Sequence, residues 1–331
     1  MKPIIIIGTG LAGYTVAREF RKLDKITPLI IITADDGGFY SKPMLSNAFA
    51  QRKLAEQLVT QTAVQMAAQI GAHIMTGTRV AGIDTARKIV TTSAGAFDYA
   101  KLVIAIGAQP IRLAISGDAA DQVMTVNHVD DYAIFRAKIA SIAHGEPARI
   151  TILGAGLIGC EFADDLAGAG HAVTLVDPNR LPLAALAAPA LSQGLHAALR
   201  DRGIDLQLGT TAASIDRIDN ALQVTLANGH TVITDLVLSA VGLRADVALA
   251  QAAQLNTGRG IIVDASGQTS AADVYALGDC AEYTLHTDGS TRLLPYIAPL
   301  MTAARAIART LTGQSTTIDL KPAPVSGKTS R

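Results

Sequence analysis

The fold of this chain is decided by the stretch Ile4-Ile5-Ile6-Ile7-Gly8-Thr9-Gly10-Leu11-Ala12-Gly13. Four consecutive isoleucines are typical of a short strand buried in a parallel sheet, and residues 14–23 follow with a helical pattern. The glycines between them have the G-x-G-x-x-G spacing. The first permits a tight turn, the second lets the backbone approach a pyrophosphate, and the third lets the helix pack closely on the strand. This stretch therefore predicts a dinucleotide-binding unit.

A second strand and an acidic residue follow in the order that such a unit requires. Residues 29–32 form another apolar run, and Asp35 comes soon after it. An acid about 20 residues past the third glycine accepts hydrogen bonds from a ribose. The phosphates bind at the helix N-terminus, where free N–H groups carry roughly half a positive charge. Strand, turn, helix, strand and acid together favour nucleotide binding over a chance occurrence of three glycines.

The same pattern returns in the middle of the chain. Residues 149–153 are predicted to be a strand, and they precede Gly154-Ala155-Gly156-Leu157-Ile158-Gly159. A helix is predicted to run through Leu166, and a strand at 171–176 ends before Asp177. Asp177 favours NADH because a carboxylate repels the 2′-phosphate of NADPH, although Arg180 keeps NADPH as an alternative. Two such sites in one chain indicate that one bound cofactor reduces the other.

The composition sets limits on the class of protein. The chain has 331 residues, of which 49% are hydrophobic and 4% aromatic, with 29 glycines, which fits two or slightly more α/β domains better than a β-sandwich. A net charge of zero implies no general attraction to nucleic acid or to an anionic membrane. No secretory signal and no apolar run long enough for a membrane span is visible, so we expect a cytoplasmic protein. The oligomeric state stays open.

The rest of the chain alternates between further predicted elements. Helices are expected at residues 51–70, 184–199 (interrupted by Pro189) and 299–311. Short strands are expected within 72–83 and at 88–92, 102–106, 236–241, 261–264 and 274–277. A hairpin with an Asn228-Gly229 turn is expected between 222–226 and 231–234. No element is predicted in the tail, residues 321–331.

These motifs resemble the rubredoxin–NAD(+) reductase branch of the FAD-dependent pyridine-nucleotide oxidoreductases. The most specific similarities lie in residues 33–37, 40–46 and 154–162, with others at 239–244, 275–281 and 298–301. The resemblance covers nearly the whole chain and implies an α/β fold with two Rossmann-like dinucleotide-binding domains. The FAD-binding domain would consist of residues 1–112 and 243–315, and the NAD-binding domain of residues 113–242. The family's C-terminal interface domain would be largely missing, with residues 316–331 as its remnant.

The resemblance also implies which residues hold the cofactors. For FAD these are Thr9, Gly10, Leu11, Ala12, Asp35, Lys42, Val80, Glu161, Asp279, Ile297 and Lys328. For NAD they are Gly154, Gly156, Ile158, Gly159, Asp177 and Gly242. Lys42 and Glu161 would act in catalysis as an ion pair near the nicotinamide and flavin N5.

Six of these residues also have an ordinary structural interpretation. Lys42 would be a solvated loop lysine and Glu161 an acid in the first turn of a helix. Asp279 would be a helix N-cap. Val80 and Ile297, which carry no chemical signature of their own, would be core residues, and the last of the set, Lys328, a lysine in a disordered tail.

The implied activity is electron transfer from NADH through FAD to rubredoxin, one electron at a time, with no metal needed. Loop 39–45 contains no cysteine, unlike the disulfide reductases and peroxidases of this fold, and Cys160 and Cys280 are expected to be packing residues. Two alternatives stay open. One is a reductase of another acceptor such as a [2Fe-2S] ferredoxin, whose branch usually has Arg-Pro-Pro-Leu-Ser-Lys where this chain has Lys-Pro-Met-Leu-Ser-Asn at 42–47. The other is a catalytically idle flavin-binding protein.

Overall fold

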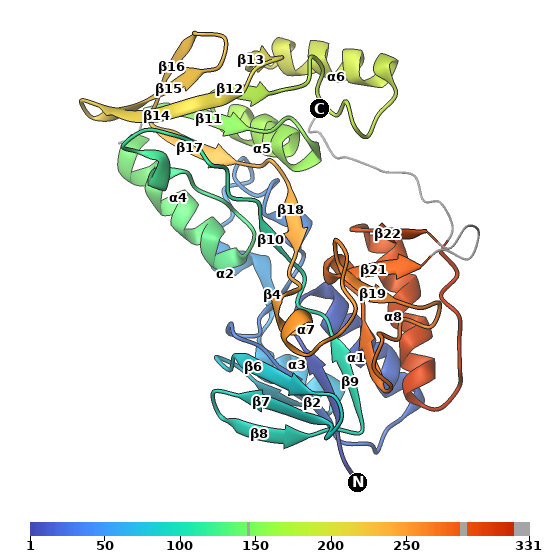
Figure 1. Ribbon diagram of the computed structural model, residues 1–331. Helices are drawn as coiled ribbons and strands as arrows, with labels where there is room; N and C mark the ends of the chain where they lie inside the picture. Colours follow the sequence, from blue (N-terminus) through green and yellow to red (C-terminus); the bar gives the residue numbers. More distant parts are fainter. Residues whose placement is uncertain (144–145, 285–289, 321–331) are drawn as a thin grey trace. The chain divides into compact units, whose positions relative to one another are not determined.

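Each of the two glycine-rich motifs begins a parallel sheet of its own (Figure 1). The computed structural model describes residues 1–143, 146–284 and 290–320. These residues form two units. The first contains Met1–Tyr40, Val59–Gln109 and the described residues from Arg244 onward, and the second contains Ser41–Leu58 and Pro110–Leu243. The segment Ser41–Leu58 therefore belongs to the second unit, although the first unit flanks it in the sequence.

The first unit is built on a five-stranded parallel sheet in the order β20-β9-β1-β2-β5. Its strands are β1 (Ile4–Ile7), β2 (Leu29–Ile32), β5 (His73–Met75), β9 (Lys101–Ile104) and β20 (Val274–Ala276). β1 pairs with β2 on one side and β9 on the other, and all four of its isoleucines are buried. A central parallel strand is covered on both faces, which explains the unbroken apolar run.

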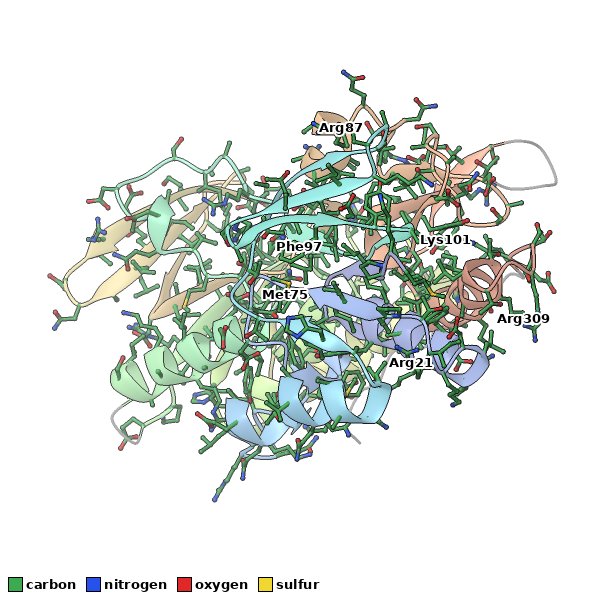
Figure 2. All side chains as sticks on the ribbon, turned by 90° about the horizontal axis from the view of Figure 1, so that it is seen from below. Arg21, Met75, Arg87, Phe97, Lys101 and Arg309 are labelled. Carbon is green, nitrogen blue, oxygen red and sulfur yellow. The ribbon has the colours of Figure 1, made fainter. Side chains whose placement is uncertain are left out.

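Helices and smaller sheets complete this unit. The helices are α1 (Leu11–Leu23), α3 (Ala63–Ile70), α7 (Ala248–Ala252) and α8 (Ile297–Leu311), together with the 3-10 turn η3 (Gly278–Cys280). The small sheets are β6 (Val80–Asp84), β7 (Ile89–Thr92) and β8 (Gly95–Asp98); β19 (Ile261–Val263), β21 (Ala281–Thr284) and β22 (Thr291–Leu293); and the pair β3 (Phe39–Tyr40) and β4 (Val59–Gln61). α1 and α8 lie side by side (Figure 1). In Figure 2, Lys101 marks the start of β9, where its Nζ donates to the carbonyl oxygen of Thr310 (2.8 Å) near the end of α8.

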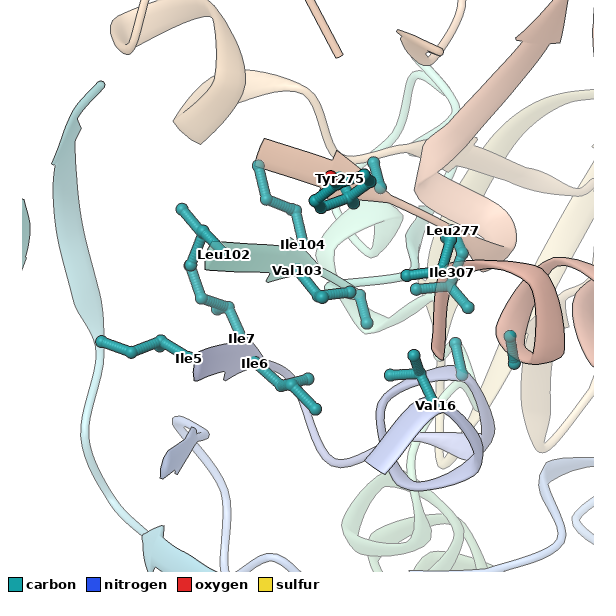
Figure 3. Close-up of a cluster of buried hydrophobic side chains, with 14 of the residues drawn as sticks. Ile5, Ile6, Ile7, Val16, Leu102, Val103, Ile104, Tyr275, Leu277 and Ile307 are labelled. Atoms are coloured by element: carbon teal, nitrogen blue, oxygen red, sulfur yellow. The ribbon is translucent and has the colours of Figure 1, made fainter. Parts of the chain in front are cut away.

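The apolar core of the first unit lies between its sheet and these helices. Figure 3 shows the side chains of β1 and β9 together with Val16 of α1 and Ile307 of α8. Ile5, Ile6 and Ile307 are fully buried. A buried side chain of this size contributes roughly 1.5–3 kcal/mol relative to an exposed one, so this packing holds the first glycine-rich loop, residues 8–13, in place between β1 and α1.

The second unit is built on a four-stranded parallel sheet in the order β13-β12-β11-β17. Its strands are β11 (Arg149–Leu153), β12 (Ala172–Asp177), β13 (Asp205–Leu208) and β17 (Leu236–Ser239). An antiparallel sheet consists of β14 (Ala212–Ile218), β15 (Ala221–Leu226) and β16 (Thr231–Thr234). The strands β10 (Ala108–Pro110) and β18 (Leu243–Ala245), which pair with each other, each contain residues of both units. The helices are α2 (Ala55–Leu58), α4 (Val129–Ala143), α5 (Leu157–Gly168) and α6 (Pro189–Asp201), with the 3-10 turns η1 (Lys42–Met44) and η2 (Ala120–Gln122). No helix within the described ranges has the length and apolar character needed to cross a membrane.

The two units repeat one chain path. In each, a strand, a glycine-rich loop and a helix lead to a neighbouring strand and then to the strand at the edge of the sheet. A three-stranded antiparallel sheet follows, β6-β7-β8 or β14-β15-β16, and the chain returns to pair with the first strand through β9 or β17. The prediction of an α/β fold with two Rossmann-like units is confirmed.

Two predicted helices differ from the structure. The expected helix at 51–70 is wrong, because the segment divides into α2, β4 and α3. Thr62 starts α3 with a capping box, in which its hydroxyl accepts from the N–H of Gln65 while the Gln65 side chain accepts from the N–H of Thr62. The helix expected at 184–199 begins only at Pro189, which suits a first helical position. α4, β8 and β14 were not predicted; the apolar residues of α4 do not gather on one side of the helix, so its pattern is weak.

Candidate functional site

The first glycine-rich loop contains two glycines that packing requires and one that it does not. A Cβ on Gly8, whose φ is +109°, would lie 2.3 Å from the carbonyl oxygen of Ala105, and one on Gly13 would lie 1.9 Å from that of Gly8. A Cβ on Gly10 would meet no atom within 4 Å, and Gly10 is exposed. The space beside Gly10 is therefore open on the side where a bound phosphate would lie.

The N-terminus of α1 is suited to an anion. Gly10 is the N-cap, no side chain among the described residues caps the helix, and its first turn contains no acid. The N–H groups of the first turn have no partner inside a helix, and the helix dipole adds positive charge there. Thr9, Gly10, Leu11 and Ala12 thus form a surface that fits a pyrophosphate.

Asp35 lies beside this loop, as the sequence predicts. Its Oδ1 accepts hydrogen bonds from Thr9 Oγ1 (3.1 Å), Thr33 Oγ1 (2.6 Å) and the N–H of Gly37 (2.9 Å). No hydrogen bond from the described residues reaches its Oδ2. The carboxylate is exposed and held in place by one oxygen, so the other can accept from a ribose hydroxyl.

The turn that carries Asp279 lies close to the start of α1. A Cβ on Gly278, whose φ is +78°, would come within 2.9 Å of the Ala12 side chain. The N–H of Gly278 donates to the buried hydroxyl of Tyr283 (3.0 Å), which ties the turn to β21. Asp279 is half-buried and lies inside η3, whose N-cap is Leu277, so the alternative that Asp279 caps a helix is wrong.

The second glycine-rich loop, residues 154–159, repeats the geometry of the first. A Cβ on Gly154 (φ +105°) would lie 2.7 Å from the carbonyl oxygen of Ala240, and one on Gly159 would lie 1.8 Å from that of Gly154. A Cβ on Gly156 would meet no atom within 4 Å. In the described structure α5, like α1, has a glycine N-cap, no side-chain cap and no acid in its first turn. This loop therefore fits a second pyrophosphate.

Asp177 is buried at the end of β12, next to the second loop. Its Oδ2 accepts from the N–H of Ala155 (2.7 Å), and its Oδ1 accepts from the N–H and the side-chain amide of Asn179 (2.8 and 2.9 Å). A carboxylate can accept about four hydrogen bonds, so capacity for a ligand remains. A cavity of about 290 Å³ adjoins this strand end and is lined by Pro178, Gly209, Thr210, Thr211, Ala227 and Asn228.

The other predicted cofactor residues have varied surroundings. Gly242 follows β17 with a φ of +117°, and Ile158, at the start of α5, is 44% exposed. Val80 begins β6 and packs partly against the first core. Ile297 begins α8 and is 53% exposed, so the alternative that it is a core residue is wrong. Lys328 lies outside the described residues.

Lys42 and Glu161 both belong to the second unit. Lys42 is the first residue of η1 and is half-buried. Glu161 is buried in α5, past the first turn, so the alternative that it is a first-turn acid is wrong. Its Oε2 accepts from Ser46 Oγ (2.6 Å) and Asn47 Nδ2 (3.2 Å). The ion pair between Lys42 and Glu161 stays a prediction.

The sequence analysis did not single out the residues that surround this glutamate. Ser46 and Asn47 contact Glu161, and Asp165, one helical turn later, accepts from two backbone amides of the same segment. One signal was available. α5 is apolar apart from three acids, and two of them, Glu161 and Asp165, have the i and i+4 spacing that places them on one side of the helix. Acids on a helix of this composition are unusual unless they bind something.

Both cysteines are buried thiols. Burial raises the pKa of Cys160 to about 12 and that of Cys280 to about 11. The Sγ of Cys160 donates to the carbonyl oxygen of Ala155 (3.4 Å), and that of Cys280 to that of Leu277 (3.3 Å). Any effect of the α5 dipole on Cys160 is outweighed by burial, and the prediction that both are packing residues agrees with these contacts.

Native protein is therefore expected to react very slowly with a thiol reagent such as dithiobis-nitrobenzoate at pH 8. The thiolate is the reactive form, and with pKa values of 11 or above it makes up about a thousandth or less of each cysteine at that pH. In urea both thiols should react at once, since burial is lost. Rapid modification of one thiol in the folded protein would contradict this prediction.

Comparisons with known proteins agree with this geometry. A family model described as pyridine nucleotide-disulphide oxidoreductase matches residues 2–308. The rubredoxin-NAD(+) reductase of Alcanivorax borkumensis is 44% identical over 99% of this chain and 84% of its own length. The nitric oxide reductase FlRd-NAD(+) reductase of Aeromonas salmonicida is 41% identical over 100% of this chain and 82% of its own. The ferredoxin reductase for the CYP199A2 system of Rhodopseudomonas palustris superimposes with a TM-score of 0.89 at 27% identity, covering 97% of this chain and 79% of that one.

Proposed function

The chain belongs to the pyridine nucleotide-disulphide oxidoreductase family, and on this premise we propose that it is an FAD-dependent reductase that passes electrons from NADH to rubredoxin. The predicted family, enzyme class and cofactors, FAD and NADH, are confirmed by the family match and by relatives at 44% and 42% identity. The observation that carries the proposal is the repeated loop, which provides one dinucleotide site in each unit.

We assign FAD to the first unit and NADH to the second. In this proposal residues 1–112 and 243–315 form the FAD-binding domain and residues 113–242 the NAD-binding domain. The first loop and Asp35 hold the ADP half of FAD, and Asp279 accepts hydrogen bonds from the ribityl chain. The half-buried carboxylate of Asp279 beside the start of α1 supports this role.

The second unit would bind NADH by the same physics. The N-terminus of α5 binds the pyrophosphate, Asp177 accepts from the adenosine ribose, and the adjoining cavity holds the adenine. Arg180 is exposed near Gly209 at this site and is the residue that would admit NADPH. The buried carboxylate of Asp177 beside Ala155 supports NADH, because a 2′-phosphate there would be repelled.

Bound FAD supplies the conversion from two-electron to one-electron chemistry, because a flavin can take up a hydride and release electrons singly. The chain's part is to bind and orient. Lys42 and Glu161 are assigned to the flavin on the family resemblance. Ser46 and Asn47 donate hydrogen bonds to Oε2 of Glu161 and so hold its carboxylate in one orientation.

The acceptor is tested by anaerobic NADH oxidation with purified rubredoxin and a [2Fe-2S] ferredoxin, each at equal concentration, and with oxygen in a separate aerobic arm. Rubredoxin is expected to give the highest kcat/KM, because the relatives at 44% and 42% identity are both named rubredoxin-NAD(+) reductase. Preference for ferredoxin would overturn the assignment of rubredoxin as the acceptor and leave the enzyme class unchanged. Stopped-flow mixing with NADH tests the class itself, because an idle flavin-binding protein would show no rapid bleaching of the flavin band.

A further inference from the structure

Two acids of α5 hold one short segment of the second unit. Glu161 and Asp165 are both buried and lie one turn apart on the same side of the helix. Glu161 binds the side chains of Ser46 and Asn47, while Asp165 binds the backbone. The N–H of Phe49 donates to Asp165 Oδ2 (2.7 Å), and that of Ala50 donates to Oδ1 (3.0 Å). Each carboxylate oxygen of Asp165 thus accepts one hydrogen bond from a backbone amide.

An aromatic contact fixes the same segment from another direction. The ring of Phe49 packs edge-on against Phe135 of α4 and against His171, with centroids 6.3 and 5.3 Å away. The guanidinium of Arg136, also on α4, lies 4.5 Å from the centre of the Phe49 ring. Residues 46–50, which we call the clamp segment, are therefore held by hydrogen bonds to α5 and by ring contacts with α4.

The clamp segment follows the turn that carries Lys42 through consecutive hydrogen-bonded turns. Within η1 and just after it, the N–H of Leu45 donates to the carbonyl oxygen of Lys42 (3.0 Å), and that of Asn47 donates to that of Met44 (3.2 Å). Consecutive hydrogen-bonded turns transmit a displacement along the chain. A shift at residues 49–50 would therefore move Lys42. It would also change the hydrogen bonds that Ser46 and Asn47 donate to Glu161.

Asp165 is not a simple source of stability. Burial raises its pKa, although the two amide hydrogen bonds act in the opposite direction. A buried carboxylate costs desolvation, and its value lies in the geometry it imposes. Two amides bound to two oxygens leave the segment only one orientation on the helix.

We propose that Asp165 is a positioning residue, which holds the clamp segment so that Lys42 and Glu161 keep the arrangement needed for reaction with NADH. This inference rests on the proposed function. Asp165 touches neither cofactor in it and acts only through the segment. It supplies a third fixed point beside Glu161 and the Phe49 ring.

The test is Asp165→Asn, with Asp164→Asn as its matched control. An asparagine has one acceptor oxygen, so its amide group would face one of the two N–H donors and release part of the segment. The control Asp164→Asn makes the same chemical change at the adjacent position. The carboxylate of Asp164 pairs with Arg202 Nε (3.1 Å) and not with the clamp segment. We expect faster hydrogen–deuterium exchange in a peptide covering 46–50 for Asp165→Asn only. We also expect its kcat with NADH and ferricyanide to fall about tenfold, with little change in KM or FAD content.

Several outcomes decide the matter. Unchanged exchange at 46–50 in Asp165→Asn would overturn the clamp, and faster exchange with a wild-type kcat would overturn its role in the reaction. If Asp165→Asn does not fold, the second variant is Phe49→Leu, which removes the ring contacts of the same segment with α4. It is expected to lower kcat with little change in KM, and a wild-type kcat in this variant would overturn the role of the segment in the reaction. The exchange measurement needs no turnover, so failure of the proposed function, seen as a wild type that does not oxidise NADH, is distinguishable from failure of the clamp.

Discussion

Replacing Gly10 by alanine is expected to strip FAD from the protein while the first unit stays folded. A Cβ at this position meets no protein atom within 4 Å, so nothing in the fold opposes it. It would instead occupy space that the pyrophosphate needs, and move the phosphates away from the N–H groups of α1. Hydrogen bonds to charged groups are worth about 1.5–3 kcal/mol each, so loss of two of them raises the Kd for FAD about 100-fold or more. Flavin absorbance after gel filtration and titration of apoprotein with FAD measure the effect.

Two other glycines of the same unit make the Gly10 result interpretable. Gly82→Ala, in β6, also places a Cβ in open space and is expected to leave FAD content unchanged. Gly13→Ala would bring a Cβ within 1.9 Å of a backbone oxygen and is expected to destabilise the unit whether or not FAD is present. Full FAD content in Gly10→Ala would show that the phosphates do not lie at α1.

Replacing Gly156 by alanine is expected to have the complementary result. FAD should stay bound, because the change lies in the second unit, while the affinity for NADH falls about 100-fold for the same reason as at Gly10. Mixed with NADH without oxygen, the flavin band should bleach slowly and only at high NADH concentration. Dithionite, which needs no nucleotide site, should still reduce the flavin fully.

The matched control in the second unit is Gly194→Ala. Gly194 lies exposed in α6, where an added Cβ also meets nothing within 4 Å. Alanine there should leave NADH affinity unchanged and stabilise the helix by about 0.5–1 kcal/mol. If Gly156→Ala lost FAD and kept NADH affinity, the assignment of the cofactors to the two units would have to be exchanged.

Much of the candidate site could be read from the sequence because its parts are local. Strand, glycine turn, helix and acid fall within about 35 residues in each unit, and their order is set by backbone geometry that glycine spacing reveals. Asp35 and Asp177 were predicted beside the two loops, and each contacts the second residue of its loop, Thr9 or Ala155. The roles of Lys42 and Glu161 came from family resemblance alone, and these roles and that of Asp279 remain proposals.

Another prediction failed where the local sequence pattern was compatible with two different secondary structures. The stretch 51–70 has the composition of one helix, yet a capping box at Thr62 starts a separate helix, and β4 pairs with β3 instead of continuing α2. Helix propensity is a weak preference, and pairing with a distant strand outweighs it.

The sequence by itself determined two nucleotide-binding loops and their order along the chain, because the close packing of Gly13 on Gly8 and of Gly159 on Gly154 acts within a single loop. Only the tertiary structure assigned Ser41–Leu58 to the second unit and set Phe49 and Ala50 on Asp165, across more than a hundred residues of sequence. Such contacts depend on which buried surfaces meet once both sheets have formed, and a backbone amide that donates to a distant carboxylate leaves no trace in the residue type that carries it.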